Sequence, residues 1–449
     1  MSSLNQFWPT RHYWKRRSEQ WDDSNESCIM KKLLLVTVLM FNGLVWSLHS
    51  SAGPFIVDHT CVALYTNLTS ADIARVKTMW ADIVGASHSL GYRVGCQLLQ
   101  SNVDSRLQVS VTDSGPMEGP TTNHLRISRA YWNTTYGSWG YGGNDGNEQT
   151  WYTSPPDIER TKAHLTYANI QGFGLSVFGF GWSWQPSWHN LATSAIDPVY
   201  QVQWSGSSVG GPDGDLAWAL DARSLSSTSN HISMDTYLQA TEQYREHCRS
   251  NRYATTVVFS TAPVDYTGDT AYQVFLKNNH IRSYVSNTTD AVLFDYADIL
   301  CWDDAGNRTT NAWSDLGGNP KFYEWVAVDN YKNLDGSLSG TGYHIGERGA
   351  LRLGKALWYM LARIAERSLL PPAPLLQASC TIPGVIQLQF AASSNAIYTV
   401  EFNSDLASPS WQILTNISSQ PYERTIQYRD QPSSTNASGF YRVAVQPAP

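Results

Sequence analysis

The sequence predicts a doubly wound α/β domain with a mainly parallel sheet, followed by a small all-β sandwich. Short β-rich runs alternate with longer helical stretches over most of the chain, which is typical of strand–helix–strand units. The composition, 42% hydrophobic and 15% charged in 449 residues, provides enough apolar material for a large core and excludes intrinsic disorder for most of the chain. After residue 367 the helical pattern stops and short alternating apolar runs begin.

The N-terminal region carries the features of an export signal. Met30-Lys31-Lys32 precedes an apolar run over 33–48 and the small residues Ser50-Ser51-Ala52. This order is typical of a signal peptide, and the run is shorter than the ~20 apolar residues of a membrane span. We therefore expect a signal peptide over 30–52 and a secreted or periplasmic mature chain with no membrane span. Residues 1–29 are expected to be an overcalled start or a disordered extension.

The α/β domain is expected to cover 53–367. The predicted strands cover 81–85, 107–112, 174–181, 254–260 and 291–300, and the predicted helices cover 90–100, 155–169, 233–252, 269–286 and 345–367. Leu353, Leu357, Leu361 and Ile364 form one stripe of the last helix, which we expect to pack on the sheet. Gly- and Trp-rich insertions cover 137–153, 185–231 and 303–343, and insertions of this length are usually functional.

A Pro-rich linker over 368–379 is expected to precede the β-sandwich, which we place over 380–449. Its predicted strands carry alternating apolar residues at Ile386/Leu388/Phe390, Tyr398/Val400/Phe402, Trp411/Ile413, Ile426/Tyr428 and Tyr441/Val443/Val445. No motif in this part indicates chemistry, so we expect a stabilising or tethering module.

Charge and cysteine content exclude two classes of function. The formal net charge is −7 and no concentrated Lys/Arg face is visible, which argues against a nucleic-acid partner. Cysteines and histidines lack the spacing of metal motifs, so we expect no metal and no other cofactor. Five cysteines follow the signal segment and cannot all pair; one disulfide would fit an oxidising compartment, and its connectivity stays open.

Two residues at the predicted sheet edge have the chemistry of a hydrolase. Ser87 follows the first strand and precedes a helix, whose dipole and free N–H groups favour an oxyanion. His344 directly precedes the last helix, so both side chains are expected at the carboxyl edge of the sheet. This arrangement predicts a nucleophile and its general base. Ser89 and His88 are the neighbouring competitors, but we expect His88 to pack or hydrogen bond locally rather than act as the base. A helix-cap role is the alternative for Ser87.

These residues also carry a family resemblance. The turn Gly85-Ala86-Ser87 after the first strand, with His344 ahead of the last helix, resembles the SGNH (GDSL-like) hydrolases. That superfamily comprises esterases and deacetylases with a flavodoxin-like sheet, and the resemblance spans roughly 54–367. It implies a divergent secreted bacterial member in which Ser87 is the nucleophile, His344 is the base, and the N–H groups of Ser87 and Gly115 form the oxyanion hole.

The chain departs from the family pattern at two places. Thr341 stands where the family has an aspartate three residues before the histidine. Gly179-Phe180-Gly181-Trp182-Ser183-Trp184 stands where the family has the asparagine of the oxyanion hole, and Ser183 is the substitute. Asp335, or else Asp329, is expected to orient His344; a Ser-His dyad without an acid is the alternative.

Tryptophans indicate the substrate class. Trp182, Trp184 and Trp188 follow the third predicted strand, and flat rings with an N–H suit stacking on sugars; core packing is the alternative for each. We expect a secreted serine esterase or deacetylase acting on an acylated polysaccharide or glycoconjugate. The alternative is a non-catalytic carbohydrate-binding or surface protein on a decayed SGNH fold.

Overall fold

The computed structural model of the chain describes residues 53–85, 87–113, 116–129, 131–133, 135, 137–139, 150–182, 234–339, 344–368, 376–382, 385–394, 396–404, 410–431 and 440–447. Within these ranges no helix combines the length and the apolar character that a membrane crossing requires.

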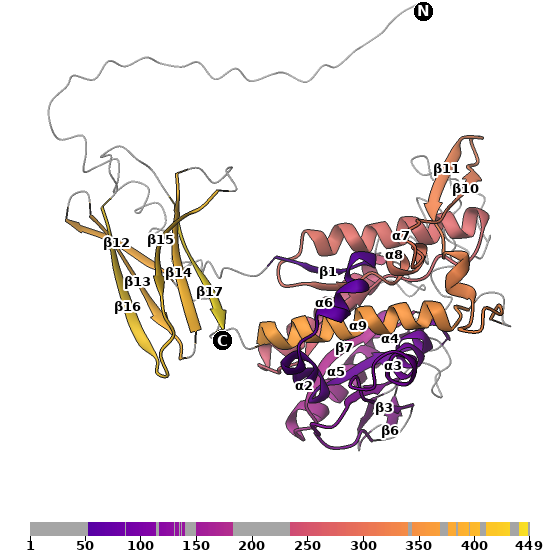
Figure 1. The fold of residues 1–449 in the computed structure, drawn as a ribbon, viewed down its shortest axis with the longest axis horizontal. Helices are drawn as coiled ribbons and strands as arrows, with labels where there is room; N and C mark the ends of the chain where they lie inside the picture. Colours follow the sequence, from indigo (N-terminus) through magenta and orange to yellow (C-terminus); the bar gives the residue numbers. More distant parts are fainter. Residues whose placement is uncertain are drawn as a thin grey trace, which may run out of the picture. The chain divides into compact units, whose positions relative to one another are not determined.

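A seven-stranded sheet with parallel pairing throughout organises the N-terminal part (Figure 1). Its strands are β1 (Phe55–Val57), β2 (Trp80–Val84), β3 (Val109–Thr112), β4 (Leu125–Ser128), β7 (Leu175–Phe180), β8 (Thr256–Ser260) and β9 (Val292–Phe294). The order is β1-β9-β8-β7-β2-β4-β3. From β2 the chain first builds β3 and β4 on one side and then β7, β8 and β9 on the other. The carboxyl end of β2 is therefore the topological switch point, where doubly wound sheets bind ligands.

Helices cover both faces of this sheet. They are α2 (Ser70–Lys77), α3 (Leu90–Asn102), α4 (Thr150–Thr153), α5 (Pro155–Ile170), α6 (Met234–Ser250), α7 (Gly268–Ser286), α8 (Tyr296–Cys301) and α9 (Glu347–Ser368), with short 3₁₀ turns η1 (His59–Cys61), η2 (Ala63–Asn67), η3 (Ser87–Ser89) and η5 (Val328–Tyr331). Along β2, Trp80 and Val84 join a buried cluster with α4 to α7, whereas Ala81 and Ile83 join a second cluster with α2, α3 and α9. Alternate strand residues thus serve two helical layers.

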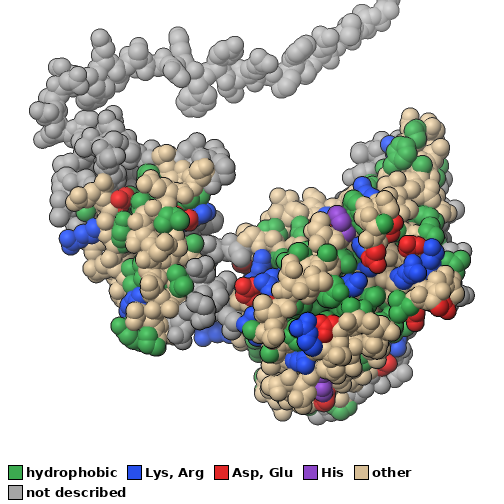
Figure 2. All heavy atoms as spheres, viewed as in Figure 1, with side chains coloured by type: hydrophobic (Ala, Val, Ile, Leu, Met, Phe, Trp, Pro, Cys, Tyr) green, Lys and Arg blue, Asp and Glu red, His purple; other side chains and the backbone are tan. Residues whose placement is uncertain are grey.

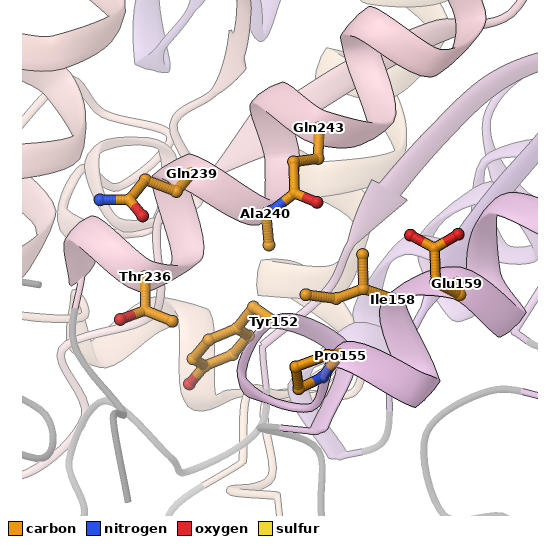
Figure 3. A pocket seen from close by; sticks show the side chains of 8 residues that line it. All are labelled: Tyr152, Pro155, Ile158, Glu159, Thr236, Gln239, Ala240 and Gln243. Atoms are coloured by element: carbon orange, nitrogen blue, oxygen red, sulfur yellow. The ribbon is translucent and has the colours of Figure 1, made fainter. Parts of the chain in front are cut away.

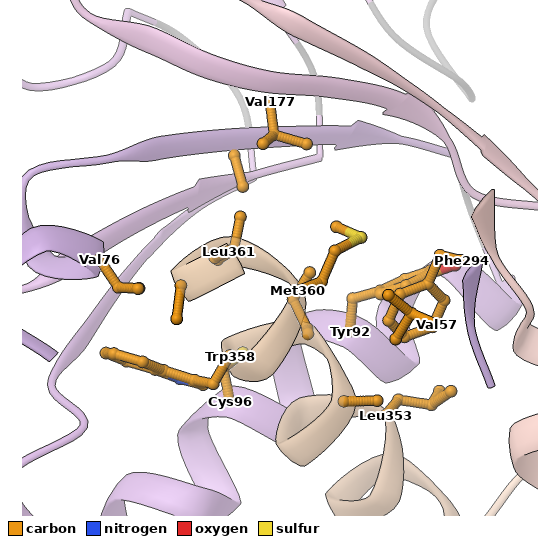
Figure 4. Close-up of a cluster of buried hydrophobic side chains, with 14 of the residues drawn as sticks. Val57, Val76, Tyr92, Cys96, Val177, Phe294, Leu353, Trp358, Met360 and Leu361 are labelled. Atoms are coloured by element: carbon orange, nitrogen blue, oxygen red, sulfur yellow. The ribbon is translucent and has the colours of Figure 1, made fainter. Parts of the chain in front are cut away.

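Helix α9 is the main support of the second layer and runs beside α3 (Figure 1). Gly95 and Gly354 lie so close at the crossing that a Cβ on either would collide with the other helix's backbone. The predicted stripe is confirmed, since Leu353, Leu357 and Leu361 are fully buried. Figure 4 shows side chains of α3, α9 and the sheet meeting in this cluster.

The predicted strands and helices are mostly present, but strands β1 and β4 and helix α2 were not predicted, and one predicted strand is wrong. Residues 291–300 are not one strand: β9 ends at Phe294, and the Asp295 carboxylate caps α8 by accepting the N–H of Asp298. Strand β4 was missed because Arg126 interrupts its apolar pattern; this fully buried side chain donates to the carbonyls of Glu118 and Phe173, which makes its burial tolerable.

The segment between α8 and α9 contains the antiparallel hairpin of β10 (Thr310–Ser314) and β11 (Pro320–Glu324), and a second short pair, β5 (Tyr131–Asn133) with β6 (Gly137–Trp139), precedes α4. Three turns between α8 and α9 share one design: the backbone carbonyl of an Asp or Asn accepts the N–H of a glycine three positions later, and that glycine has a φ of +80° to +87°. The pairs are Asp303 with Gly306, Asp315 with Gly318, and Asn333 with Gly336. Glycine suits this left-handed position because it has no Cβ.

The C-terminal part contains two three-stranded antiparallel sheets. Their strands are β12 (Gln377–Ile382), β13 (Val385–Ala392), β14 (Ala396–Asn403), β15 (Gln412–Ile417), β16 (Arg424–Asp430) and β17 (Phe440–Pro447), in the orders β12-β13-β16 and β15-β14-β17. Leu388 and Phe390 of one sheet and Tyr398 and Val400 of the other belong to a single buried cluster. The predicted alternation of apolar residues is therefore confirmed for β13 and β14. It is wrong for β15, where Ile413 is 58% exposed and Leu414 and Ile417 pack against the cluster instead. An irregularity in the pairing of β14 with β15 accompanies this change of face.

The cysteines and the surface charges of the described residues also bear on the sequence expectations. Cys61, Cys96, Cys248 and Cys301 are buried free thiols, so none of these four forms the disulfide considered above. On the face drawn in Figure 2, basic and acidic side chains of the α/β region are interspersed.

Candidate active site

Ser87 lies on a tight turn at the carboxyl end of β2. Gly85, directly after the strand, has a φ of +139°, and a Cβ there would collide with the carbonyl oxygen of Gly181. Ser87 itself has a φ of +48°, in the left-handed region that serine rarely occupies. Helix α3 begins three residues later, at Leu90. A serine held in this strained strand-to-helix turn is presented above the sheet, as nucleophiles in hydrolases commonly are.

His344 provides the partner of this serine. Its Nε2 is hydrogen bonded to Ser87 Oγ, across 257 positions of sequence. The residue lies just ahead of α9, so the strand-to-helix turn and the start of the last helix meet at one edge of the sheet. The predicted juxtaposition of Ser87 and His344 is therefore present.

The other ring nitrogen of His344 is unusual. Nδ1 is buried and has no hydrogen-bond partner among the described residues. Burial lowers the pKa of the His344 imidazole and the neighbouring His88 lowers it further, whereas the carboxylate of Asp265 acts in the opposite direction. The ring is therefore neutral at neutral pH and available as a proton acceptor.

A buried histidine–carboxylate pair adjoins the Ser87–His344 contact. His88 Nε2 lies 2.8 Å from Asp265 Oδ2, and both side chains are less than 5% exposed. The rings of His88 and His344 are stacked, with centroids 5.1 Å apart and planes inclined by 24°. The hydroxyl of Tyr296 donates to the backbone carbonyl of His88, which further fixes the turn.

Sequence reasoning did not identify Asp265. It lies five residues after β8, at the same carboxyl edge of the sheet as Ser87, and it reaches His88 across 177 positions. Its place after a predicted strand was a usable signal, because parallel strands gather such residues at one edge. His88, expected to pack or bond locally, instead makes this long-range bond.

The two aspartates expected to orient His344 lie elsewhere. Asp335 is exposed, and its carboxylate accepts the N–H and the hydroxyl of Ser337 within its own turn. The hydrogen bonds from Ser337 also lower the pKa of the Asp335 carboxyl. Asp329 pairs with Lys332 Nζ at 2.6 Å. The structure thus corrects the assignment of Asp335: it is a turn residue, as its Asn333-Leu334-Asp335-Gly336 context favours.

Trp182 also differs from its predicted role. It is 2% exposed, its indole N–H donates to the carbonyl of Ser260, and its ring packs against Phe180 and Tyr237. As placed, it belongs to the core and offers no face for a sugar. The remaining predicted residues lie outside the described residues: Gly115, Ser183, Trp184, Trp188 and Thr341.

A small cavity of about 120 Å³ lies between α5 and α6 and is lined by Tyr152, Ile158, Thr236 and Gln243, among others (Figure 3). Neither Ser87 nor His344 lines it. It is separate from the Ser87–His344 contact, and we assign it no chemistry.

Two overlapping clusters of described residues have the residue types of a metal site: Asp58, His59 and Asp298, and Asp298, Cys301 and Glu324. Ligand atoms of Asp58, His59 and Asp298 lie within 4.8 Å of one another. These groups already satisfy one another and the backbone: Asp298 accepts from the N–H and Nδ1 of His59, and Asp58 accepts from the N–H of Thr60. In the second cluster, Glu324 pairs with Arg282, and the Cys301 thiol donates to the backbone carbonyl of Asp298.

Hydrogen bonds and a ring stack thus connect four residues at the carboxyl edge of the sheet: Ser87, His344, His88 and Asp265. Comparison of the chain with models of known protein families and with curated proteins finds no match.

Proposed function

We propose that the chain is a serine ester hydrolase of the SGNH type, with Ser87 as nucleophile and His344 as general base. The hydrogen bond between Ser87 Oγ and His344 Nε2 carries this proposal. Two features support it: the serine is held in a strained turn at the switch point of the sheet, and the lowered pKa of His344 favours its basic form.

In this mechanism His344 Nε2 takes the proton of Ser87 Oγ while that oxygen attacks the ester carbonyl carbon. The carbonyl oxygen becomes an oxyanion, for which the N–H groups of Ser87 and Gly115 are the proposed donors. The bond to the alcohol then breaks, His344 returns its proton to the leaving alcohol, and acyl-Ser87 remains. Water, deprotonated by His344, attacks the acyl carbon, and the carboxylic acid and Ser87 hydroxyl are released.

The first turn of α3 adds to oxyanion stabilisation in this proposal. Ser89 at its N-cap makes no side-chain capping bond, and the 3₁₀ turn η3 runs directly from Ser87 into the helix. The positive end of the helix dipole then faces the region of Ser87, where negative charge develops in the transition state.

Finer features of the fold belong to the same proposal. Apart from the edge strands β1 and β3, the order β4-β2-β7-β8-β9 corresponds to the flavodoxin-like pattern 2-1-3-4-5. The shared buried cluster of the two C-terminal sheets supports a β-sandwich. We further propose a secreted or periplasmic protein, from the segment 30–52, and an acylated carbohydrate substrate, from the Trp-rich composition around residues 184–188.

Reaction with a fluorophosphonate tests the function directly, because these reagents form a covalent bond only with an activated serine. We expect the intact mature protein to be labelled, with the adduct at Ser87, and to hydrolyse a small acetyl ester. Labelling at another serine would move the nucleophile. A protein inert to both the probe and the ester would support the alternative, a non-catalytic carbohydrate-binding protein.

A further inference from the structure

The unpaired Nδ1 of His344 poses a specific chemical problem. When His344 accepts the serine proton it becomes an imidazolium, and in a Ser-His-Asp triad a carboxylate bonded to Nδ1 stabilises that charge. Here Nδ1 is buried without an acceptor among the described residues, and Asp335 and Asp329 bond elsewhere. Among the described residues, any negative charge that stabilises the imidazolium therefore acts on the ring other than through a bond to Nδ1.

We propose that His88 and Asp265 form a positioning pair that supplies the negative charge for the imidazolium of His344, in place of a carboxylate on its Nδ1. This inference rests on the proposed function. The ring of His88 is stacked on that of His344, and the Nε2 atom of His88 is hydrogen bonded to Asp265. Within this pair the negative charge resides on the Asp265 carboxylate, which favours the protonated form of His344.

The same contacts set the orientation of the base. The ring stack restricts rotation of His344 and keeps its Nε2 toward Ser87. Because His88 directly follows Ser87, the bond to Asp265 also anchors the nucleophile's own turn, and Tyr296 holds the His88 carbonyl from α8. One buried carboxylate thus positions both partners of the proton transfer.

Among the described residues, Asp265 is the carboxylate that acts on His344. Besides His88 and His344, the titratable groups on which Asp265 acts among the described residues include Tyr296 and Tyr331. Burial, together with Asp265, raises the pKa of each tyrosine above its ordinary value, so both phenols stay neutral at physiological pH.

The test compares Asp265→Asn with a matched control, Asp82→Asn. Asp82 is also a buried carboxylate beside a histidine, His164, but it lies within strand β2, where it accepts the hydroxyl of Ser128. For Asp265→Asn we expect the plateau kcat on a small acetyl ester to fall by about 10- to 1,000-fold, less than the ~10⁴ lost when a direct triad acid is removed. The acidic limb of the pH–rate profile should move to lower pH, since the charge that raises the pKa of His344 is gone.

A second variant separates this role from a merely structural one. His88→Phe keeps a flat ring against His344 but lacks the bond to Asp265, so it should reproduce the loss. The double variant should lose little more, because the two residues act as one unit. Asp82→Asn should lower the melting temperature without moving the acidic limb. A folded Asp265→Asn protein with wild-type kcat and acidic limb would overturn the proposal.

An NMR titration makes the inference independent of turnover. The imidazole signal of His344, identified by its absence in His344→Gln, is followed against pH in the wild type and in Asp265→Asn. We expect a lower pKa in the variant, and an unchanged pKa would overturn the proposal. An inert protein that still shows this shift would contradict the hydrolase function alone and would leave the coupling of Asp265 to His344 standing.

Discussion

Two buried histidine–carboxylate pairs lie beside strand β2, and they differ in what surrounds them. At the carboxyl end of the strand, His88 and Asp265 are 2.8 Å apart and adjoin the Ser87–His344 contact. Within the strand, Asp82 lies 3.5 Å from His164 and accepts the hydroxyl of Ser128. The second pair is completely buried.

The difference shows that residue chemistry does not by itself define the site. Both regions contain a serine, a histidine and an aspartate within the same sheet. Around Asp82, the Ser128 hydroxyl also accepts the indole N–H of Trp80, so this group is held in a network that stabilises the core. At the edge, Ser87 has a strained backbone and a neutral base in hydrogen-bond contact. Location at the switch point distinguishes a candidate nucleophile from a structural hydroxyl.

The largest expected effect separates the two serines. Ser87→Ala should remove hydrolysis of a small acetyl ester almost entirely, by as much as ~10⁶ in kcat, because the covalent intermediate cannot form. Its melting temperature should stay close to that of the wild type. Ser128→Ala should do the reverse, costing about 1 to 3 kcal/mol of stability through the unpaired Asp82 and Trp80 while preserving kcat. Full activity in Ser87→Ala would break the comparison and make Ser89 the next candidate.

A backbone substitution tests whether the turn itself is required. Gly85→Ala introduces a Cβ against the Gly181 carbonyl at a φ of +139°, so the turn must shift and Ser87 should lose both probe labelling and activity. Gly306→Ala is the matched control: its φ is +82°, with no atom within 4 Å of the added Cβ, and it should cost only about 1 to 2 kcal/mol. Thermal unfolding and fluorophosphonate labelling report the two effects, and equal labelling in both variants would contradict the role of the turn.

The pH dependence follows from the environment of His344. Since burial and His88 lower the pKa of this histidine, activity should persist below the ordinary value of ~6.5 and then fall about tenfold per pH unit once the ring is protonated. A pH–rate profile of kcat/KM measures this limb. An acidic limb well above 6.5 would show that another group controls the reaction.

The smallest effect is expected at the exposed turn. Asp335→Asn should change kcat by less than about twofold, because asparagine also accepts hydrogen bonds in such turns and the carboxylate does not contact His344. The stability of the fold should likewise be unaffected. A loss of several orders of magnitude, measured on the folded variant, would restore Asp335 as the orienting acid.

Much of the fold was predictable because it depends on local patterns. The helical stripe of α9 and the apolar runs of β2, β7 and β8 record which face of each element is buried, and this periodicity is a property of neighbouring residues. The approach of Ser87 to His344 was predictable for a related reason: parallel strands and their following helices deliver their connecting turns to one edge of the sheet.

Tertiary structure decided the partners of those residues. Asp335 is nine residues from His344 yet bonds within its own turn, whereas Asp265 is 177 residues from His88 and bonds to it. Trp182 follows a strand at the expected edge, but its ring turns into the core. By itself the sequence determined the long helices, the strands β2, β7 and β8, and which of their turns share an edge. Which carboxylate reaches the histidines depends on contacts between distant segments, because burial and hydrogen bonding act on neighbours in space.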